Sequence, residues 1–164
     1  MTIRFGILTL SDRSARGERA DSSGPALARL IEAEGWSLAK QAILPDDESA
    51  IREMLISWVD SNEIDVILTT GGTGFSPRDV TPEATRAVIE REAPGLAEAM
   101  RAESLRITPH AMLSRIVAGI RGKTLIVNLP GSPKGAMENL QVILPVLEHA
   151  VKLIQDSPKA EAGH

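Results

Sequence analysis

An apolar run enters a glycine-rich turn at residues 64–74, which read IDVILTTGGTG. The run from Ile64 to Thr70 is typical of a buried strand, and Thr81-Pro82-Glu83 beyond the turn predicts a helix start with a capping threonine. Glycine tolerates positive φ and lets the backbone approach a ligand, so this turn can direct several N–H groups at a phosphate. The sequence matches neither the Walker A nor the dinucleotide-binding pattern, and a tight strand-to-helix turn is an equally good interpretation.

Strand and helix patterns alternate on both sides of this stretch. Short apolar runs predict further strands at 4–10, 38–44 and 124–129. Helical spacing predicts a helix with Pro25 as its first residue, one after Asp46-Asp47-Glu48, one over 95–105 and one over 134–155. The alternation favours a three-layer α/β fold, with a mostly parallel sheet and helices on both faces. Residues 1–156 are expected to form one domain, with 157–164 as a flexible tail.

Composition narrows the classes of function. The chain has 164 residues, a net charge of −4, 43% hydrophobic and 24% charged residues, values typical of a soluble domain. It has no cysteine, which excludes thiolate zinc sites, redox motifs and a thiol nucleophile. The negative charge and the absence of tyrosine argue against nucleic-acid binding. No apolar run reaches the roughly 18 residues of a membrane span, so we expect no membrane association and a cytoplasmic location.

Polar or Gly/Pro-rich segments follow the predicted strands. They are Ser11-Asp12-Arg13, Pro45-Asp46-Asp47, Thr69 to Gly74, and Asn128 to Pro133. Ligands of open α/β sheets bind beyond the carboxyl ends of the strands, so these segments are candidate binding loops. Asp46 and Asp79 lie just past strand ends, where two carboxylates can hold one Mg²⁺ that bridges nucleotide phosphates. The alternatives are local: an N-cap for Asp46, and for Asp79 a turn side chain bonded to its own backbone.

The histidines and serines give weaker evidence of a catalytic or metal-binding role. His110, His149 and His164 lack the spacing of metal ligands and are interpreted as non-catalytic. Ser104 and Ser114 lie in or near helical stretches without an adjacent His or Lys, and no Gly-x-Ser-x-Gly elbow occurs. The pattern alone therefore indicates surface or capping serines.

Two longer stretches resemble a known family. Residues 69–85 read TTGGTGFSPRDVTPEAT, and a later block joins Leu113-Ser114-Arg115 through 118–126 (AGIRGKTLI) to 128–133 (NLPGSP). Both resemble the molybdopterin adenylyltransferases, the family of MogA, MoaB and the G domain of gephyrin. Ser11-Asp12, Ser23-Gly24-Pro25 and Pro45-Asp46 also fit, so the match spans nearly the whole chain in order. The resemblance implies the molybdopterin-binding, MogA-like fold.

The resemblance also implies an activity. Members transfer AMP from ATP to the terminal phosphate of molybdopterin with Mg²⁺, release pyrophosphate, and are typically homotrimers. A separate molybdenum-insertion protein is then the expected partner, since the insertion domain of the gephyrin type is absent from this sequence. One alternative is a non-catalytic, MoaB-like trimer that binds or carries molybdopterin, and another is a nucleotide-binding domain with a different substrate.

Family likeness assigns roles to individual residues. It implies catalysis by Asp46, Asp79 and Ser114, with Mg²⁺ held by the two aspartates. It implies substrate binding by Ser11, Asp12, Gly71, Gly72, Thr73, Gly74, Ser104, Asn128, Pro130 and Gly131. The serines are linked to the pterin, and Asn128 with the Pro130-Gly131 turn is linked to the nucleotide. We further hypothesise that Arg78 or Lys134 offsets charge on the departing pyrophosphate.

Overall fold

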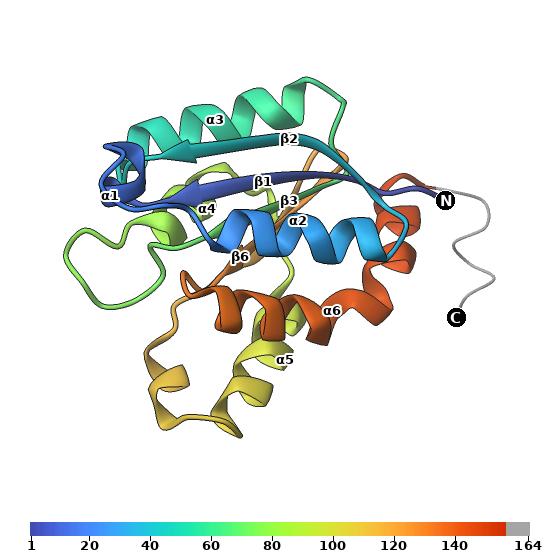
Figure 1. Cartoon of the computed structure of the whole chain (residues 1–164). Coiled ribbons are helices and arrows are strands. Elements are labelled where there is room, and N and C mark those ends of the chain that lie inside the picture. Colours follow the sequence, from blue (N-terminus) through green and yellow to red (C-terminus); the bar gives the residue numbers. More distant parts are fainter. Residues whose placement is uncertain (157–164) are drawn as a thin grey trace.

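A six-stranded sheet forms the centre of the protein in a computed structural model, which describes residues 1–156 (Figure 1). Its strands are β1 Arg4–Leu10, β2 Ser37–Leu44, β3 Val66–Thr70, β4 Arg91–Glu92, β5 Ala118–Arg121 and β6 Thr124–Leu129. Their order across the sheet is β2-β1-β3-β6-β5-β4. The first four in this order run parallel, whereas β5 is antiparallel to both neighbours. The predicted mostly parallel sheet is confirmed.

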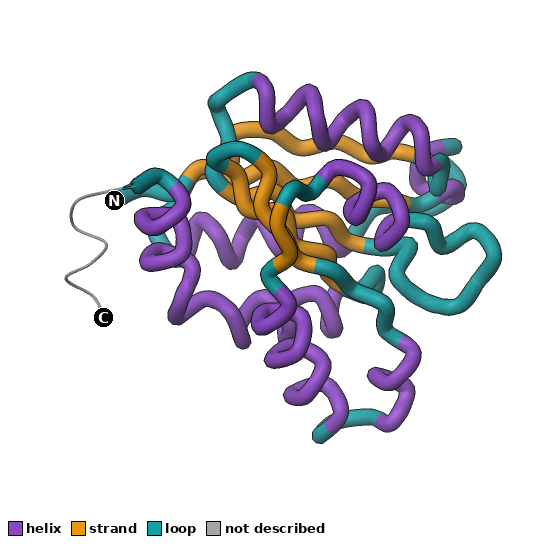
Figure 2. Tube along the Cα trace, turned by 180° about the vertical axis from the view of Figure 1, so that it is seen from behind, coloured by secondary structure: helices purple, strands orange, loops and turns teal. Residues whose placement is uncertain are grey.

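Helices cover both faces of the sheet (Figure 2). They are α1 Asp12–Ala15, α2 Ser23–Ala33, α3 Glu48–Asp60, α4 Thr81–Val88, α5 Pro94–Leu105 and α6 Pro133–Ile154, with a short 3-10 helix over Pro109–Leu113. Helices α2, α5 and α6 pack together on one face, and α3 and α4 pack on the other. The three-layer prediction is therefore confirmed. No helix within residues 1–156 is long and apolar enough to cross a membrane.

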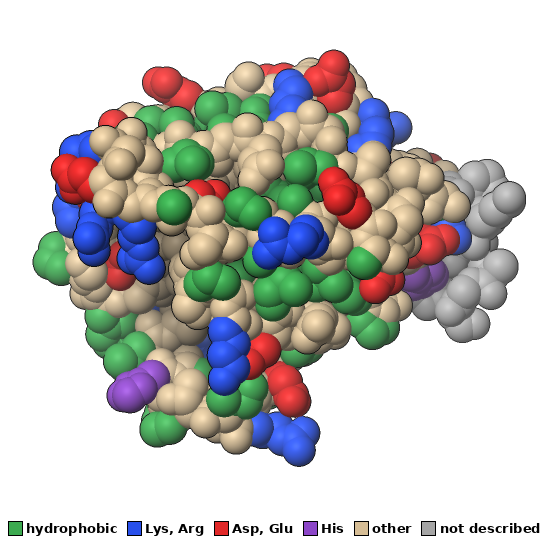
Figure 3. Space-filling view, in the orientation of Figure 1, with side chains coloured by type: hydrophobic (Ala, Val, Ile, Leu, Met, Phe, Trp, Pro, Cys, Tyr) green, Lys and Arg blue, Asp and Glu red, His purple; other side chains and the backbone are tan. Residues whose placement is uncertain are grey.

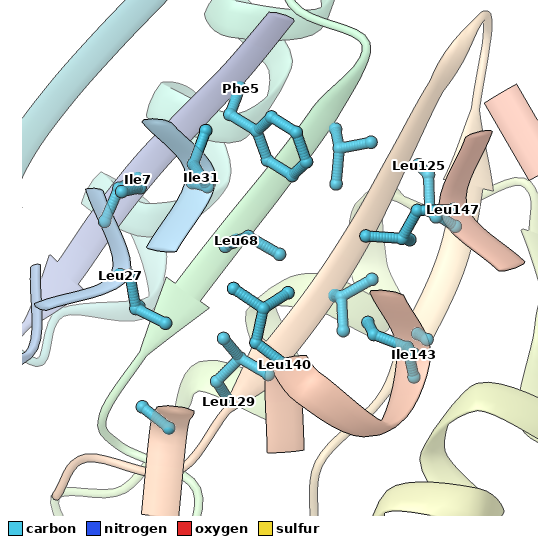
Figure 4. Close-up of a cluster of buried hydrophobic side chains, with 14 of the residues drawn as sticks. Phe5, Ile7, Leu27, Ile31, Leu68, Leu125, Leu129, Leu140, Ile143 and Leu147 are labelled. Carbon is cyan, nitrogen blue, oxygen red and sulfur yellow. The ribbon is translucent and has the colours of Figure 1, made fainter. Parts of the chain in front are cut away.

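Each face of the sheet has its own hydrophobic core. Side chains of a strand alternate between faces, so Val66 and Leu68 of β3 enter one core and Ile67 enters the other. The larger core joins β1, β3 and β6 to α2 and α6, as Figure 4 shows with Phe5, Leu68 and Leu140 among the labelled side chains. Burial on both faces explains why these strands are continuous apolar runs.

Two predicted helix starts differ from the structure. Helix α2 begins at Ser23, so Pro25 is its third residue rather than its first. The third position tolerates proline because the first four N–H groups of a helix have no intrahelical acceptor. Thr81 is the first residue of α4 and not its cap, since its buried hydroxyl donates to the Gly71 carbonyl at 2.9 Å. Tertiary contact with the glycine turn thus replaces the expected local cap.

Strands β4 and β5, at one side of the sheet, were not predicted. They are short, and Gly119 interrupts the apolar run of β5. Gly122, with φ of 56°, begins the tight turn that returns the chain into β6. The expected tail, 157–164, and His164 lie outside the described residues.

Candidate functional site

A cavity of about 320 Å³ opens where the parallel strands end. Register places Leu10 beside Leu44 and Thr70 beside both Thr9 and Leu129, so all four carboxyl ends meet at one edge. The chain leaves β1 toward β2 on one side of the sheet and leaves β3 toward β4 on the opposite side. The gap between β1 and β3 is therefore the point where the strand order reverses, and ligands of open α/β sheets bind at that point. The predicted residues that line the cavity are Ser11, Asp46, Gly71, Gly72, Asp79 and Gly131.

The glycine turn is sharp and tightly packed. Gly71 has a φ of 102° and Gly72 a φ of 67°, a region that other L-residues rarely adopt. A side chain on Gly71 would collide with the Leu10 carbonyl, and one on Gly72 would meet the Thr81 hydroxyl and Oδ1 of Asp46. The tight strand-to-helix turn is therefore present, and it leaves room for the Asp46 carboxylate beside the backbone.

Asp46 does not cap α3, because the neighbouring Asp47 accepts from the N–H of Ser49 at 3.1 Å. Oδ2 of Asp46 instead accepts from the backbone N–H of Asp12 at 3.1 Å. Its Oδ1 is buried and has no hydrogen-bond partner. Burial, with the nearby charges of Asp12 and Asp79, raises the pKa of Asp46 above its ordinary range.

Asp79 bonds to the backbone of its own turn, as one of the two predictions for it states, and it also lines the cavity. Its Oδ2 accepts from the backbone N–H of Ser76 at 3.0 Å, and its side chain lines the cavity with Asp46. Residues 1–156 contain no group of three or more His, Asp or Glu side chains that could hold a metal ion. Mg²⁺, however, is often bound through one or two carboxylates with substrate phosphates and water. The unpartnered Oδ1 of Asp46 fits such a pair of ligands.

Arg78 and Lys134 do not line this cavity. Two nitrogens of Arg78 donate to the two carboxylate oxygens of Asp12, both at 2.9 Å. This pairing, with the backbone N–H of Asp46, lowers the pKa of Asp12. Lys134 is highly exposed and lies 3.9 Å from Glu138. Charged side chains of both signs gather over α1 beside a hollow in Figure 3, which places cations at the rim of the site.

A second cavity of about 220 Å³ adjoins the first. It contains Ser104 and Ser114 among apolar side chains such as Ile107 and Ala111. The Ser104 hydroxyl accepts from the amide of Asn139 at 2.7 Å, whereas the buried hydroxyl of Ser114 has no partner. The cavity is also lined by His110 and by Pro130. Ser132 lines both cavities, so the segment after β6 borders the two.

Four predicted residues lie outside both cavities: Asp12, Thr73, Gly74 and Asn128. Asn128 is fully buried and its amide donates to the hydroxyls of Thr69 and Thr85, both at 2.9 Å. Its Oδ1 accepts from the N–H of Val117 at 3.1 Å. Asn128 therefore ties β6 to β3, to α4 and to the segment before β5.

Several lining residues were missed in the sequence. Asp21 accepts from the Thr9 hydroxyl at 2.8 Å and from the Gly24 N–H at 3.1 Å, which holds the start of α2 against the end of β1. Ser23 donates to the Gly131 carbonyl at 2.6 Å. The other lining residues without a prediction are Leu10, Ser14, Arg19, Ala20 and Ser22, whereas Thr70 and Ser132 belong to the predicted binding loops. In the sequence, the polar residues just before α2 were the feature that could have indicated this part of the cavity.

Known proteins resemble this chain over most of its length. The family described as "Probable molybdopterin binding domain" matches residues 6–149. The chain is 49% identical to the molybdenum cofactor synthesis protein cinnamon of Drosophila melanogaster, over 94% of this chain and 26% of that protein. It thus spans about a quarter of the length of that relative.

A bacterial relative and a solved structure match more of their own length. The chain is 41% identical to the molybdopterin adenylyltransferase of Helicobacter pylori J99, over 93% of this chain and 88% of that protein. The molybdopterin biosynthesis enzyme MoaB of Thermus thermophilus superposes with a TM-score of 0.90 at 52% identity. That superposition covers 96% of this chain and 99% of the other.

Proposed function

Because this chain belongs to the "Probable molybdopterin binding domain" family, we propose that it is a molybdopterin adenylyltransferase. A terminal phosphate oxygen of molybdopterin attacks the α-phosphorus of ATP, the bond from that phosphorus to the bridging oxygen breaks, and pyrophosphate leaves. The products are adenylylated molybdopterin and pyrophosphate. The observation that carries the proposal is the Asp46 and Asp79 pair beside a polar cavity, with Oδ1 of Asp46 buried and unpartnered.

The two cavities suit different parts of the substrates. The first presents hydroxyls, glycine backbone and the start of α2, which are groups that bind phosphate well. The second combines apolar walls with the hydroxyls of Ser104 and Ser114, which suits a flat heteroaromatic ring such as a pterin. Because Ser132 borders both, a pterin in the second cavity can extend its phosphate into the first.

The reaction requires alignment and charge neutralisation rather than a protein nucleophile. Mg²⁺ held by Asp46 and Asp79 would neutralise phosphate charge and orient the triphosphate. Gly71 and Gly72 allow the sharp turn at this point, and they line the cavity in which phosphate oxygens would bind. Ser114 offers an unpartnered hydroxyl to the pterin or its phosphate. The side chain of Asp12 acts indirectly, since its oxygens are bonded to Arg78 and to the Asp46 backbone.

A reconstituted assay tests the proposal. Purified protein is incubated with molybdopterin, ATP and MgCl₂, and both adenylylated molybdopterin and pyrophosphate are measured. Asp46→Asn and Asp79→Asn should each lower kcat by about 100-fold or more, a loss typical of removing an electrostatic group that acts in the transition state. Binding of molybdopterin should change far less, since neither carboxylate lines the second cavity.

Asp47→Asn is the matched control for Asp46→Asn. Asp47 is adjacent in sequence but caps α3, and Asn is an equally good N-cap, so this variant should keep its activity. Equal losses in molybdopterin binding and in turnover for Asp79→Asn would contradict the metal role. Tight molybdopterin binding by the wild type without product would instead favour the second candidate, a MoaB-like carrier.

Assembly and location complete the proposal. We infer that residues 1–156 act as one domain and that the protein forms a homotrimer. The exposed apolar side chains Leu105, Ile107, Met112, Val146 and Leu153 offer surface for such an assembly. ATP as donor supports a cytoplasmic reaction, and a molybdenum-insertion protein is the expected consumer of the product. Light scattering of the purified protein measures the oligomeric state directly.

A further inference from the structure

Arg115 holds the loop that carries Asp79. Its Nε donates to the Gly74 carbonyl at 2.8 Å, and its Nη2 donates to the Asp79 carbonyl at 2.8 Å. Its Nη1 donates to Oε2 of Glu83 at 2.6 Å. The backbone N–H of Arg115 also donates to the Thr73 carbonyl at 2.8 Å. A single residue, distant in sequence, therefore contacts the loop at its beginning and at its end.

Beyond Arg115, one side-chain contact ties the loop to a distant segment: Arg78 donates to both carboxylate oxygens of Asp12. Residues 75–78 are exposed, and Phe75 at the tip has 68% of its surface accessible. Within the loop, the N–H of Asp79 donates to the Ser76 carbonyl at 2.9 Å, and the Asp79 carboxylate accepts from the Ser76 N–H. These bonds close a local turn, and the exposed Arg78–Asp12 pair ties only its tip to the segment after β1. Arg115 connects it to the chain segment before β5 and to α4.

The guanidinium is suited to this task. It is planar, permanently charged and has donors in a fixed fork, so its bonds to two carbonyls hold them at a set separation. A lysine can present charge at the same place but cannot reproduce that fork. The ion pair with Glu83 is partly exposed, and exposed pairs contribute little to stability. The effect of Arg115 should therefore fall on the loop and much less on the whole fold.

We propose that Arg115 is a positioning residue, which fixes the loop of residues 73–79 so that the Asp79 carboxylate faces Asp46 across the first cavity. The effect on turnover rests on the proposed function, whereas the effect on the loop does not. Loss of the guanidinium lets the loop sample other conformations, and Asp79 then spends less time in the arrangement that serves the metal. The molybdopterin subsite is formed by other residues and keeps its affinity.

Hydrogen–deuterium exchange of the metal-free protein tests the loop directly. In Arg115→Ala, the amides of residues 73–80 should exchange about tenfold faster. The loop loses roughly one net hydrogen bond, which shifts its local opening equilibrium toward the open form by that factor. Arg115→Lys should also exchange faster, because charge alone does not replace the fork. Glu83→Gln keeps both carbonyl bonds and should change the loop little. Arg86→Ala serves as the matched control. Arg86 is an exposed arginine on α4, the helix that carries Glu83, and it pairs with Glu92 of β4 rather than with the loop.

Kinetics supply the second measurement. Arg115→Ala should lower kcat about tenfold and raise the Mg²⁺ concentration for half-maximal rate, with the KM for molybdopterin changed less than twofold. Unchanged amide exchange of the loop in both Arg115 variants overturns the proposal. Exchange that accelerates in β1 and α6 as much as in the loop also overturns it, because the whole fold would then be affected. A rise in the KM for molybdopterin with kcat intact also overturns it. If the wild type makes no product, the proposed function fails while the exchange result still decides the role of Arg115. If Arg115→Ala does not fold, Arg115→Lys provides the test.

Discussion

The backbone N–H of Asp12 donates to Oδ2 of Asp46 at 3.1 Å, and the backbone N–H of Asp46 donates to Oδ1 of Asp12 at 3.0 Å. This reciprocal pair joins the segments that follow β1 and β2. Arg78 neutralises Asp12, so that carboxylate is bonded on both oxygens. Asp46 is held by one oxygen only, and its Oδ1 remains available to a ligand.

Asp46→Asn should stabilise the metal-free protein at neutral pH. The pKa of Asp46 is raised, chiefly by burial, so the folded state binds this proton more tightly than the unfolded state. Ionisation therefore reduces stability as the pH rises from the ordinary Asp pKa, about 4, through the folded-state pKa. Asn avoids that loss. Thermal unfolding in EDTA should give a higher Tm for the variant at pH 7, with a difference that shrinks toward pH 4. A lower Tm at pH 7 would contradict this electrostatic account.

Gly72→Ala should be more destabilising than Gly35→Ala. Both glycines have positive φ, 67° and 80°, which costs alanine about 1 kcal/mol in either place. A methyl group on Gly35 meets nothing, whereas one on Gly72 collides with Thr81 and adds about 2 kcal/mol of overpacking. Urea unfolding measures the two free energies. Gly35→Ala should also retain full activity. Equal losses in the free energy of unfolding for the two variants would show that the collision with Thr81 contributes nothing.

Ser114→Ala should leave stability nearly unchanged and reduce kcat/KM. The buried hydroxyl has no partner in the protein, so its removal takes away no hydrogen bond from the fold. A hydrogen bond to substrate worth about 1.4 kcal/mol corresponds to a tenfold lower kcat/KM for molybdopterin. Ser104→Ala is the useful contrast, because it deprives Asn139 of its acceptor and should cost about 1 kcal/mol of stability. Unchanged kinetics in Ser114→Ala would remove this serine from the site.

Asn128→Ala should act on stability and not on nucleotide binding. The substitution leaves the Val117 N–H without its acceptor, removes the donor to two threonine hydroxyls, and opens a small cavity. Together these losses should cost about 3 kcal/mol in the free energy of unfolding. The KM for ATP, measured below the unfolding transition, should stay within twofold of the wild type. A raised KM at normal stability would restore the nucleotide-binding role.

Most of the fold was predictable because local patterns agree with it. The continuous apolar runs of β1, β3 and β6 indicate strands buried on both faces, and helical spacing between them requires parallel crossovers. Helices α5 and α6 begin and end within one residue of prediction. Strands β4 and β5 were missed because they have two and four residues, too few for any period to show.

The sequence by itself determined the alternation of strands and helices, the glycine turn after β3, and the two family motifs that contain Asp46 and Asp79. Only the tertiary structure decided what each side chain contacts. It buried Asn128 among partners from β3 and α4, paired Asp12 with Arg78, assigned the cap of α3 to Asp47 rather than Asp46, and brought Arg115 to the loop of Asp79. The physical reason is distance along the chain. These partners are set by strand register and by which of several competing donors lies nearest, whereas periodicity reports only which face of an element is buried.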